Sequence, residues 1–217
     1  MKTVLEFLKG LKENNTREWF EANRKGYEAA KGEFEKMLNE LIPEIYSFDP
    51  QIGILTAKDC VFRIYRDVRF SKDKSPYKTN MGGYICKGGR KGMFAGYYVH
   101  VEPGMSMLAG GIYMPPPDVL KKVRQEVYYN AEVFKGILNG RDFKKTFRVM
   151  EDDKLSRPPK DFPADFKDID LLKYKSYTVM HGVTDETLVS KGLLDYMVKV
   201  FRVMKPFNGF LNRGLEG

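Results

Sequence analysis

Cysteine and histidine are scarce in this sequence of 217 residues, which contains two of each. Cys60 and Cys86 show no C-x-x-C spacing, and His100 and His181 lie in different parts of the chain. These spacings argue against a zinc site, a His-rich metal site and a thioredoxin-like redox motif. We therefore expect no metal and no cofactor. Two isolated thiols are also typical of a reducing cytoplasm, where disulfides are rare.

Long apolar runs are absent too. No stretch of about 18 apolar residues occurs, which argues against a transmembrane helix. The first residues, MKTVLEFLKGLKENN, carry charges throughout and lack the apolar core of a signal peptide. We expect a cytoplasmic protein that does not bind membranes, and the sequence leaves its oligomeric state open.

Familiar catalytic motifs are missing as well. There is no H-E-x-x-H or G-x-S-x-G, and GGRKG at 88–92 lacks the spacing of a P-loop. Two S-x-x-K tetrapeptides begin at Ser71 and Ser75, but the S-D-N and K-T-G partners of penicillin-binding enzymes are not there. Motifs therefore leave open whether the protein is an enzyme.

The composition is that of a folded globular protein, with 42% hydrophobic and 13% aromatic residues. Lys and Arg outnumber Asp and Glu by 37 to 29, which gives a formal net charge of +8. This excess is compatible with nucleic acid, a membrane surface or acidic metabolites, and selects none of them. Without a repeat or a low-complexity linker, residues 1–217 are predicted to form a single domain.

The order of the expected elements predicts an α+β fold. Residues 1–47 have helical patterns, and residues 59–114 have strand patterns. Residues 116–217 are again helical, with a long connection at 151–175 that is rich in proline and charge. We expect an antiparallel β-sheet against which helices from both the N-terminal and the C-terminal thirds pack.

Apolar spacing and capping residues place the helices. The first is expected over 3–13, and Asn15 is expected to cap the second. A long helix follows, which should bend or break near Pro43, because proline removes a helix hydrogen bond. Toward the C-terminus the pattern predicts one helix over 190–204 and a short one over 206–213.

A period of two predicts strands between the helical parts. In one of them, Gly110 and Gly111 indicate a bulge or a close approach of two backbones. The stretch KSYTVMHGV at 175–183 could add an edge strand. The other expected strands are 59–70, 81–86, 94–102 and 107–114.

The stretch FRIYRDVRFSKDKSPYKTN at 62–80 is the most unusual part of the chain. Guanidinium forks match carboxylate or phosphate oxygens, and on a strand Arg63 and Arg69 would share one polar face with Asp67 between them. We predict a pocket for a small anion, built on the basic strand and loop at 63–78. The candidate ligand-binding residues are Arg63, Tyr65, Arg66, Asp67, Arg69, Lys72, Lys74, Tyr77, Lys78 and Glu102.

Arg66 falls on the apolar face of the predicted strand, where an unpaired charge would be costly. Two alternatives stay open for it. It forms an ion pair beneath the helices, or a β-bulge near Asp67 turns it toward the patch. His100, on an outward strand face with Glu102, is the candidate proton carrier, because histidine ordinarily titrates near neutral pH. A structural role for this histidine is the alternative.

Four segments between residues 14 and 177 resemble those of a known family: NNTREWFEANRKGYE, FRIYRDVRFSKDKSPYKTN, GYYVHVEPG and LLKYKSY. On these residues the chain resembles domain of unknown function 2461, a bacterial and fungal family of conserved hypothetical proteins. The resemblance implies a single-domain α+β protein and transfers no catalytic residue. Asp161 departs from the family pattern, because glycine is expected at this position. The departure affects the expected local turn and not the resemblance.

Three functions stay open at this point. The first is a pocket for phosphate, a nucleotide or a carboxylate, in which replacing Arg69 with alanine should abolish binding with little loss of stability. The second is a non-specific nucleic-acid-binding module, since basic and aromatic residues alternate at 62–80. Acidic residues occur along the whole chain, and the sequence contains no nucleic-acid-binding motif. Both observations argue against a nucleic-acid-binding module. The third is a purely structural network of Arg, Asp and Tyr, with the function elsewhere.

Overall fold

The computed structural model describes residues 1–149 and 154–216 and has the α+β architecture that the sequence predicts. Its sheet has five strands in the order β1-β2-β3-β5-β4, and every neighbouring pair is antiparallel. The strands are β1 (Met81–Ile85), β2 (Gly96–Val101), β3 (Met107–Ile112), β4 (Arg148–Val149) and β5 (Tyr177–Gly182).

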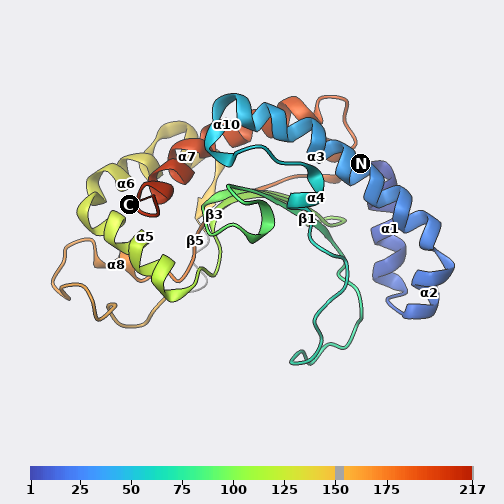
Figure 1. Cartoon of the computed structure of the whole chain (residues 1–217), viewed down its shortest axis with the longest axis horizontal. Helices are drawn as coiled ribbons and strands as arrows, with labels where there is room; N and C mark the ends of the chain where they lie inside the picture. The colour runs from blue at the N-terminus through green and yellow to red at the C-terminus, as the bar shows by residue number, and fades with distance from the viewer. Residues whose placement is uncertain (150–153, 217) are drawn as a thin grey trace.

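Helices from both ends of the chain cover one face of this sheet, as predicted (Figure 1). The two longest, α3 (Arg24–Phe48) and α10 (Leu193–Arg213), contact each other, and they pack on β1 and β3 respectively. The other α-helices are α1 (Lys2–Glu13), α2 (Arg17–Ala22), α4 (Ala57–Cys60), α5 (Pro117–Tyr129), α6 (Ala131–Asn139), α7 (Arg141–Thr146), α8 (Ile169–Leu172) and α9 (Asp185–Leu188). Two 3-10 turns are η1 (Pro50–Ile52) and η2 (Gly89–Lys91).

The core lies between the sheet and the helical layer. On β2, Tyr97, Val99 and Val101 are buried, and Tyr97 contacts rings of both α3 and α10. Each such side chain contributes roughly 1.5–3 kcal/mol relative to exposure. Because strand side chains alternate, Tyr98 and His100 point to the other face of the sheet. Within the part of the chain that the structure describes, no layer of helices covers that second face (Figure 1).

Two glycines of β3 allow the close approach that the sequence indicates. A Cβ atom at Gly110 would lie 2.0 Å from the sulfur of Met204 on α10. Gly111 has a φ of +96°, and a Cβ there would lie 1.9 Å from the carbonyl oxygen of Tyr177. A larger residue at either position would therefore force the sheet and its neighbours apart.

The prediction of a strand over residues 59–70 is wrong. Residues 57–60 form α4, and the rest is an irregular hairpin held by isolated bridges of Val61 with Gly83 and of Tyr65 with Tyr77. The alternation of residue types is real, and Cys60 and Ile64 of its apolar face are buried. Toward the tip of the hairpin this packing ends, and Phe70 is 96% exposed. The segment projects from the sheet on the side away from α3 and α10 (Figure 1).

Several helix boundaries differ from the expectations. Thr16, rather than Asn15, caps α2, by accepting a hydrogen bond from the Trp19 amide. The break between α2 and α3 falls at Asn23, and α3 continues through Pro43. The two helices expected near the C-terminus form a single helix, α10, which contains Pro206. An interior proline costs about 3 kcal/mol, and buried apolar residues on both sides of each proline offset this cost.

The strand at 177–182 is not at the edge. It lies between β3 and the two-residue strand β4, which forms the edge instead. The region expected to be helical from 116 onward therefore also supplies two strands. Residues 151–153 of the predicted connection lie outside the described residues, and the described remainder includes α8.

Candidate functional site

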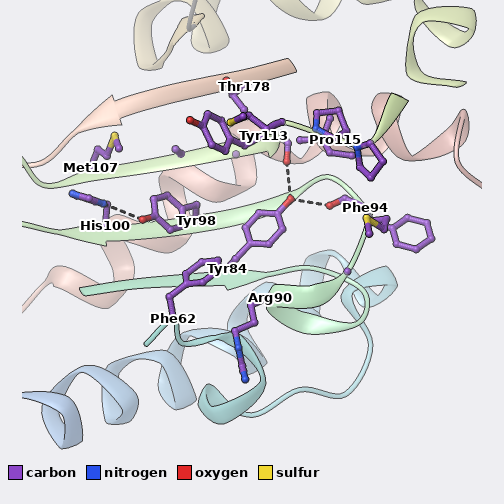
Figure 2. Close-up of a pocket in the computed structure, with 18 of the residues that line it drawn as sticks. Phe62, Tyr84, Arg90, Phe94, Tyr98, His100, Met107, Tyr113, Pro115 and Thr178 are labelled. Carbon is purple, nitrogen blue, oxygen red and sulfur yellow. Dashed lines mark hydrogen bonds between the residues drawn. The ribbon is translucent and has the colours of Figure 1, made fainter. Parts of the chain in front are cut away.

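A groove of about 580 Å³ lies on the face of the sheet that the helices leave open (Figure 2). Its walls come from two hairpin residues, Phe62 and Lys78, the turn around η2, strands β1, β2, β3 and β5, and residues 113–116. Most of the lining is apolar or aromatic. The aromatic lining residues are Phe62, Tyr84, Phe94, Tyr98 and Tyr113.

Small residues hollow out the floor of the groove. Ala109 of β3 lies opposite Tyr98 in the register and lines the floor. On the other side of β2, a Cβ atom at Gly82 would lie only 2.6 Å from the hydroxyl of Tyr98. Glycine at this position of β1 therefore allows the Tyr98 ring to lie across the neighbouring strand.

Tyr84 fixes one wall of the groove. Its hydroxyl lies 2.8 Å from the carbonyl oxygens of both Phe94 and Gly111, and it can donate to either (Figure 2). Burial raises the pKa of Tyr84 well above its ordinary value, so the hydroxyl keeps its proton. The bond ties the segment before β2 to the distorted end of β3.

A chain of hydrogen bonds runs along the open face of β2. The hydroxyl of Tyr98 lies 3.0 Å from Nδ1 of His100, whose Nε2 lies 3.1 Å from Oε2 of Glu102. Oε1 of Glu102 accepts from the Thr79 hydroxyl at 2.7 Å. Burial, and then the charge of Glu102, raise the pKa of Tyr98 to about 12. The expectation that His100 and Glu102 share an outward face is confirmed.

Lys78 is the cation of the hairpin that reaches the groove. Its side chain is half-buried, and Nζ lies 5.6 Å from the centre of the Phe62 ring. Burial, and then the positive charge of Arg63, lower the pKa of Lys78. Within residues 1–149 and 154–216, no carboxylate forms an ion pair with it. A desolvated positive charge with a second cation nearby is thus left without a counter-ion in the described chain.

The guanidinium groups of the hairpin do not converge as the sequence suggests. Asp67 binds Arg69 through both carboxylate oxygens, at 3.0 Å to Nε and 2.7 Å to Nη2. This pair is exposed and lies outside the lining of the groove. Lys74 donates to the carbonyl of Val68 at 3.0 Å, whereas Arg63 and Lys72 are exposed. Among the described residues, the patch expected between Arg63 and Arg69 is therefore not a cavity.

Arg66 follows neither alternative in full. It forms an ion pair, but with Asp73 of its own hairpin instead of a group beneath the helices. Hydrogen bonds from Ser75, and then Arg66, lower the pKa of Asp73. Because the chain turns back between these residues, a local acid reaches Arg66 without a β-bulge.

Tyr65 and Tyr77 anchor the hairpin to α2 instead of lining the groove. Tyr77 is 3% exposed and stacks on Phe20, with ring centres 4.0 Å apart and planes 11° apart. Tyr65 packs beside both rings. The side-chain amide of Asn15 donates to the carbonyl of Tyr77 and accepts from its backbone amide. These contacts fix the segment that leads into Lys78.

Sequence reasoning missed several lining residues. Arg90 lines the groove from the turn GGRKG and donates to the carbonyl of Lys58 at 2.5 Å. Phe94, Tyr113 and Thr178 also line it, from three further segments. The sequence offers no signal that would join them, because only the strand order brings these segments to one end of the sheet.

The model of one protein family, described as conserved hypothetical protein (DUF2461), matches residues 3–210. The chain belongs to the DUF2461 family. This finding confirms the resemblance noted in the four sequence segments. No curated protein and no solved structure matches the chain.

Two features are absent from the described part of this DUF2461 protein. No helix in it is both long and apolar enough to cross a bilayer. Nor does it bring three or more His, Cys, Asp or Glu side chains together in a way that could hold a metal ion.

Proposed function

We propose that this DUF2461 protein binds a small organic anion in the groove on the open face of the sheet. The charged group of the ligand, a carboxylate or a phosphate, lies at Lys78, and its apolar body lies on the aromatic walls. The observation that carries the proposal is the half-buried ammonium group of Lys78, which has no ion-pair partner in the described chain.

The energetics of Lys78 favour an anion there. Burying a charge without a partner is costly, and the neighbouring charge of Arg63 adds repulsion. A ligand oxygen in contact with Nζ would offset both costs. A hydrogen bond to a charged group contributes about 1.5–3 kcal/mol, which corresponds to roughly a tenfold to hundredfold change in affinity.

The groove also suits the rest of such a ligand. A volume of about 580 Å³ falls in the range of pockets for small molecules, which combine apolar walls with a few polar groups. Phe62 and Tyr98 meet edge to face, with ring centres 6.3 Å apart, beside the lysine. An apolar or aromatic ligand body would bury their exposed faces.

Of the residues predicted from sequence, the proposal keeps four in the site: Lys78 as the anion contact, Arg63 as a nearby positive charge, and His100 with Glu102. The others, apart from the exposed Lys72, are assigned to holding the hairpin in shape, as the structural alternative expects. Nucleic-acid binding has less support, because Arg66 and Arg69 are already paired with acids.

The proposal is tested with two fluorescent probes of similar shape. One is 8-anilinonaphthalene-1-sulfonate, which is an anion, and the other is N-phenyl-1-naphthylamine, which is neutral. Lys78→Met should weaken binding of the sulfonate by about tenfold or more and leave binding of the neutral probe nearly unchanged. Lys72→Met, on the exposed part of the same hairpin, is the matched control and should change neither.

Circular dichroism and thermal unfolding show whether each variant is folded. Equal affinity of the wild type and Lys78→Met for the sulfonate would sink the proposal. Binding of duplex DNA that weakens steeply with salt in the wild type, and is lost in Arg69→Ala, would instead favour the nucleic-acid function.

A further inference from the structure

The hydrogen-bonded chain on β2 meets the anion site at one end of the groove. Phe62 packs against Tyr98 on one side, and the ammonium group of Lys78 lies over the Phe62 ring. Thr79, the next residue after Lys78, donates to Glu102 at the far end of the chain. Tyr98 and His100 both line the groove, and their bond is drawn in Figure 2.

The direction of each bond in this chain follows from what each atom can do. A carboxylate accepts only, so Nε2 of His100 must carry the hydrogen that points to Glu102. In a neutral imidazole the other nitrogen, Nδ1, then has a lone pair and accepts the hydroxyl hydrogen of Tyr98. In this state the hydroxyl proton points toward His100, and only oxygen lone pairs of Tyr98 remain for a ligand. An anion beside them would be repelled.

One added proton reverses the bond between Tyr98 and His100. With a proton from solvent on Nδ1, the imidazolium donates to the tyrosine oxygen, and the tyrosine hydroxyl becomes free to donate elsewhere. We infer that His100 takes up one proton when the anion binds, so that Tyr98 becomes a second hydrogen-bond donor to the anion beside Lys78. This inference rests on the proposed function and adds the protonation state in which the site binds. No covalent bond forms or breaks between heavy atoms, and the solvent supplies the proton.

The charges around His100 are consistent with this coupling. On its own segment it contacts Tyr98 and Glu102, and the Glu102 carboxylate can accept the hydrogen of Nε2 in either protonation state of the ring. Its register partners, Gly82 on β1 and Met107 on β3, carry no titratable group. Lys78, on the segment before β1, lines the same groove as His100, and two positive charges on one groove repel each other. A bound anion offsets that repulsion, so protonation and binding favour each other.

The sign of the pH dependence follows. Affinity for the anion should be greatest at low pH, where the free protein already carries the proton. In the pH range in which the complex holds the proton and the free protein does not, uptake of one proton predicts a decrease of about tenfold per pH unit. The sulfonate probe stays ionised throughout, so its own titration does not contribute.

Isothermal titration calorimetry with 8-anilinonaphthalene-1-sulfonate tests the inference on the full chain. Binding is measured near pH 7.5 in triethanolamine and in Tris, two cationic buffers whose heats of ionisation differ, and the difference reports the protons taken up. We expect uptake that approaches one proton per probe in the wild type. His100→Gln, which cannot take up the proton, and Tyr98→Phe, which keeps the ring, should both show no uptake and an affinity independent of pH.

The outcomes separate the two proposals. Uptake that persists in His100→Gln would assign the proton to another group, such as Lys78, and would overturn the inference. Absence of uptake in a wild type whose binding still depends on Lys78 would overturn it too, but would leave the proposed function intact. Probe binding that does not depend on Lys78 would contradict both the proposed function and this inference.

Discussion

The amide of Gly111 donates to Oδ1 of Asn208 at 2.9 Å, although Gly111 lies opposite Gly96 in the ladder between β2 and β3. Nδ2 of the same asparagine donates to the carbonyl of Gly96 at 2.9 Å. A fully buried side chain of α10 thus binds a backbone group of each strand. The helical layer behind the sheet therefore helps to shape the floor of the groove in front of it.

Replacing Asn208 with leucine should destabilise the protein strongly. The leucine fills a similar volume but leaves the Gly111 amide and the Gly96 carbonyl buried without a partner. Each unsatisfied group costs about 1–3 kcal/mol, so a loss of roughly 2–6 kcal/mol in the free energy of unfolding is expected for the two groups, measured by urea denaturation. Asn139→Leu, at an exposed position of α6, is the control and should change stability by less than about 0.5 kcal/mol. Equal stability of the two variants would contradict this role of Asn208.

Periodicity predicted those parts of the fold that pack on a buried surface. The inward face of β2 and the apolar stripes of the long helices were correct because their side chains meet the common core. The same alternation misled at 59–70. There Cys60 and Ile64 are buried, but Phe70 is 96% exposed, since the end of the hairpin projects away from the rest of the described chain (Figure 1).

The candidate site could be predicted only in part. Lys78 was named from sequence because it belongs to the basic segment 62–80, and His100 and Glu102 were named because alternation places them on one outward strand face. Arg90 and Thr178 could not be found in this way, since the strand order places them on the groove from distant segments. The ion pair of Arg66 with Asp73 could not be predicted either, because it depends on where the irregular hairpin turns back.

The amide of Asn15 should be essential for holding the hairpin on the N-terminal helices. Its Oδ1 accepts from the Tyr77 amide at 3.1 Å, and its Nδ2 donates to the Tyr77 carbonyl at 3.0 Å. Asn15→Ala removes both bonds and should cost about 1–3 kcal/mol of stability. Hydrogen exchange at the Tyr77 amide should become faster.

Asn14→Ala is the matched control for this prediction, because within the described residues the side chain of Asn14 makes a single, exposed hydrogen bond, to the carbonyl of Gly10. It should leave exchange at Tyr77 unchanged. If hydrogen exchange at the Tyr77 amide is equally slow in both variants, the prediction is contradicted, and stacking on Phe20 is sufficient to hold the hairpin.

Thr178 offers a substitution that should stabilise the protein. The residue is 6% exposed, and its hydroxyl has no hydrogen-bond partner in the described chain. Valine has nearly the same shape and removes the cost of the buried hydroxyl, so Thr178→Val should raise the free energy of unfolding by about 1 kcal/mol. The midpoint of thermal or urea unfolding measures the change.

A second threonine provides a control of opposite sign. The hydroxyl of Thr184 caps α9 by accepting from the Thr187 amide, so Thr184→Val should lower stability by about 1 kcal/mol. A loss of stability in both variants would mean that the Thr178 hydroxyl is hydrogen-bonded in solution, for example to a water molecule in the groove, and would contradict the prediction.

The two thiols should be unreactive in the folded protein. Burial, followed by the charges of Asp59 and Cys86, raises the pKa of Cys60 to about 12, and burial raises the pKa of Cys86 to about 11. Since the thiolate is the reactive form, a disulfide reagent such as 5,5′-dithiobis(2-nitrobenzoate) at about pH 8 should modify neither thiol in native buffer. In concentrated guanidinium chloride it should modify both.

The same shifts set the sign of a pH effect on stability. In the unfolded chain a thiol loses its proton near pH 8.5, whereas the folded thiols keep theirs to higher pH. Stability contributed by these groups is therefore complete below about pH 8.5 and is lost as the pH rises above it. The double variant Cys60→Ala/Cys86→Ala should show a shallower decline in urea midpoint over this range than the wild type. Identical slopes, together with rapid labelling of the native protein, would show that the thiols titrate as they do in the unfolded chain.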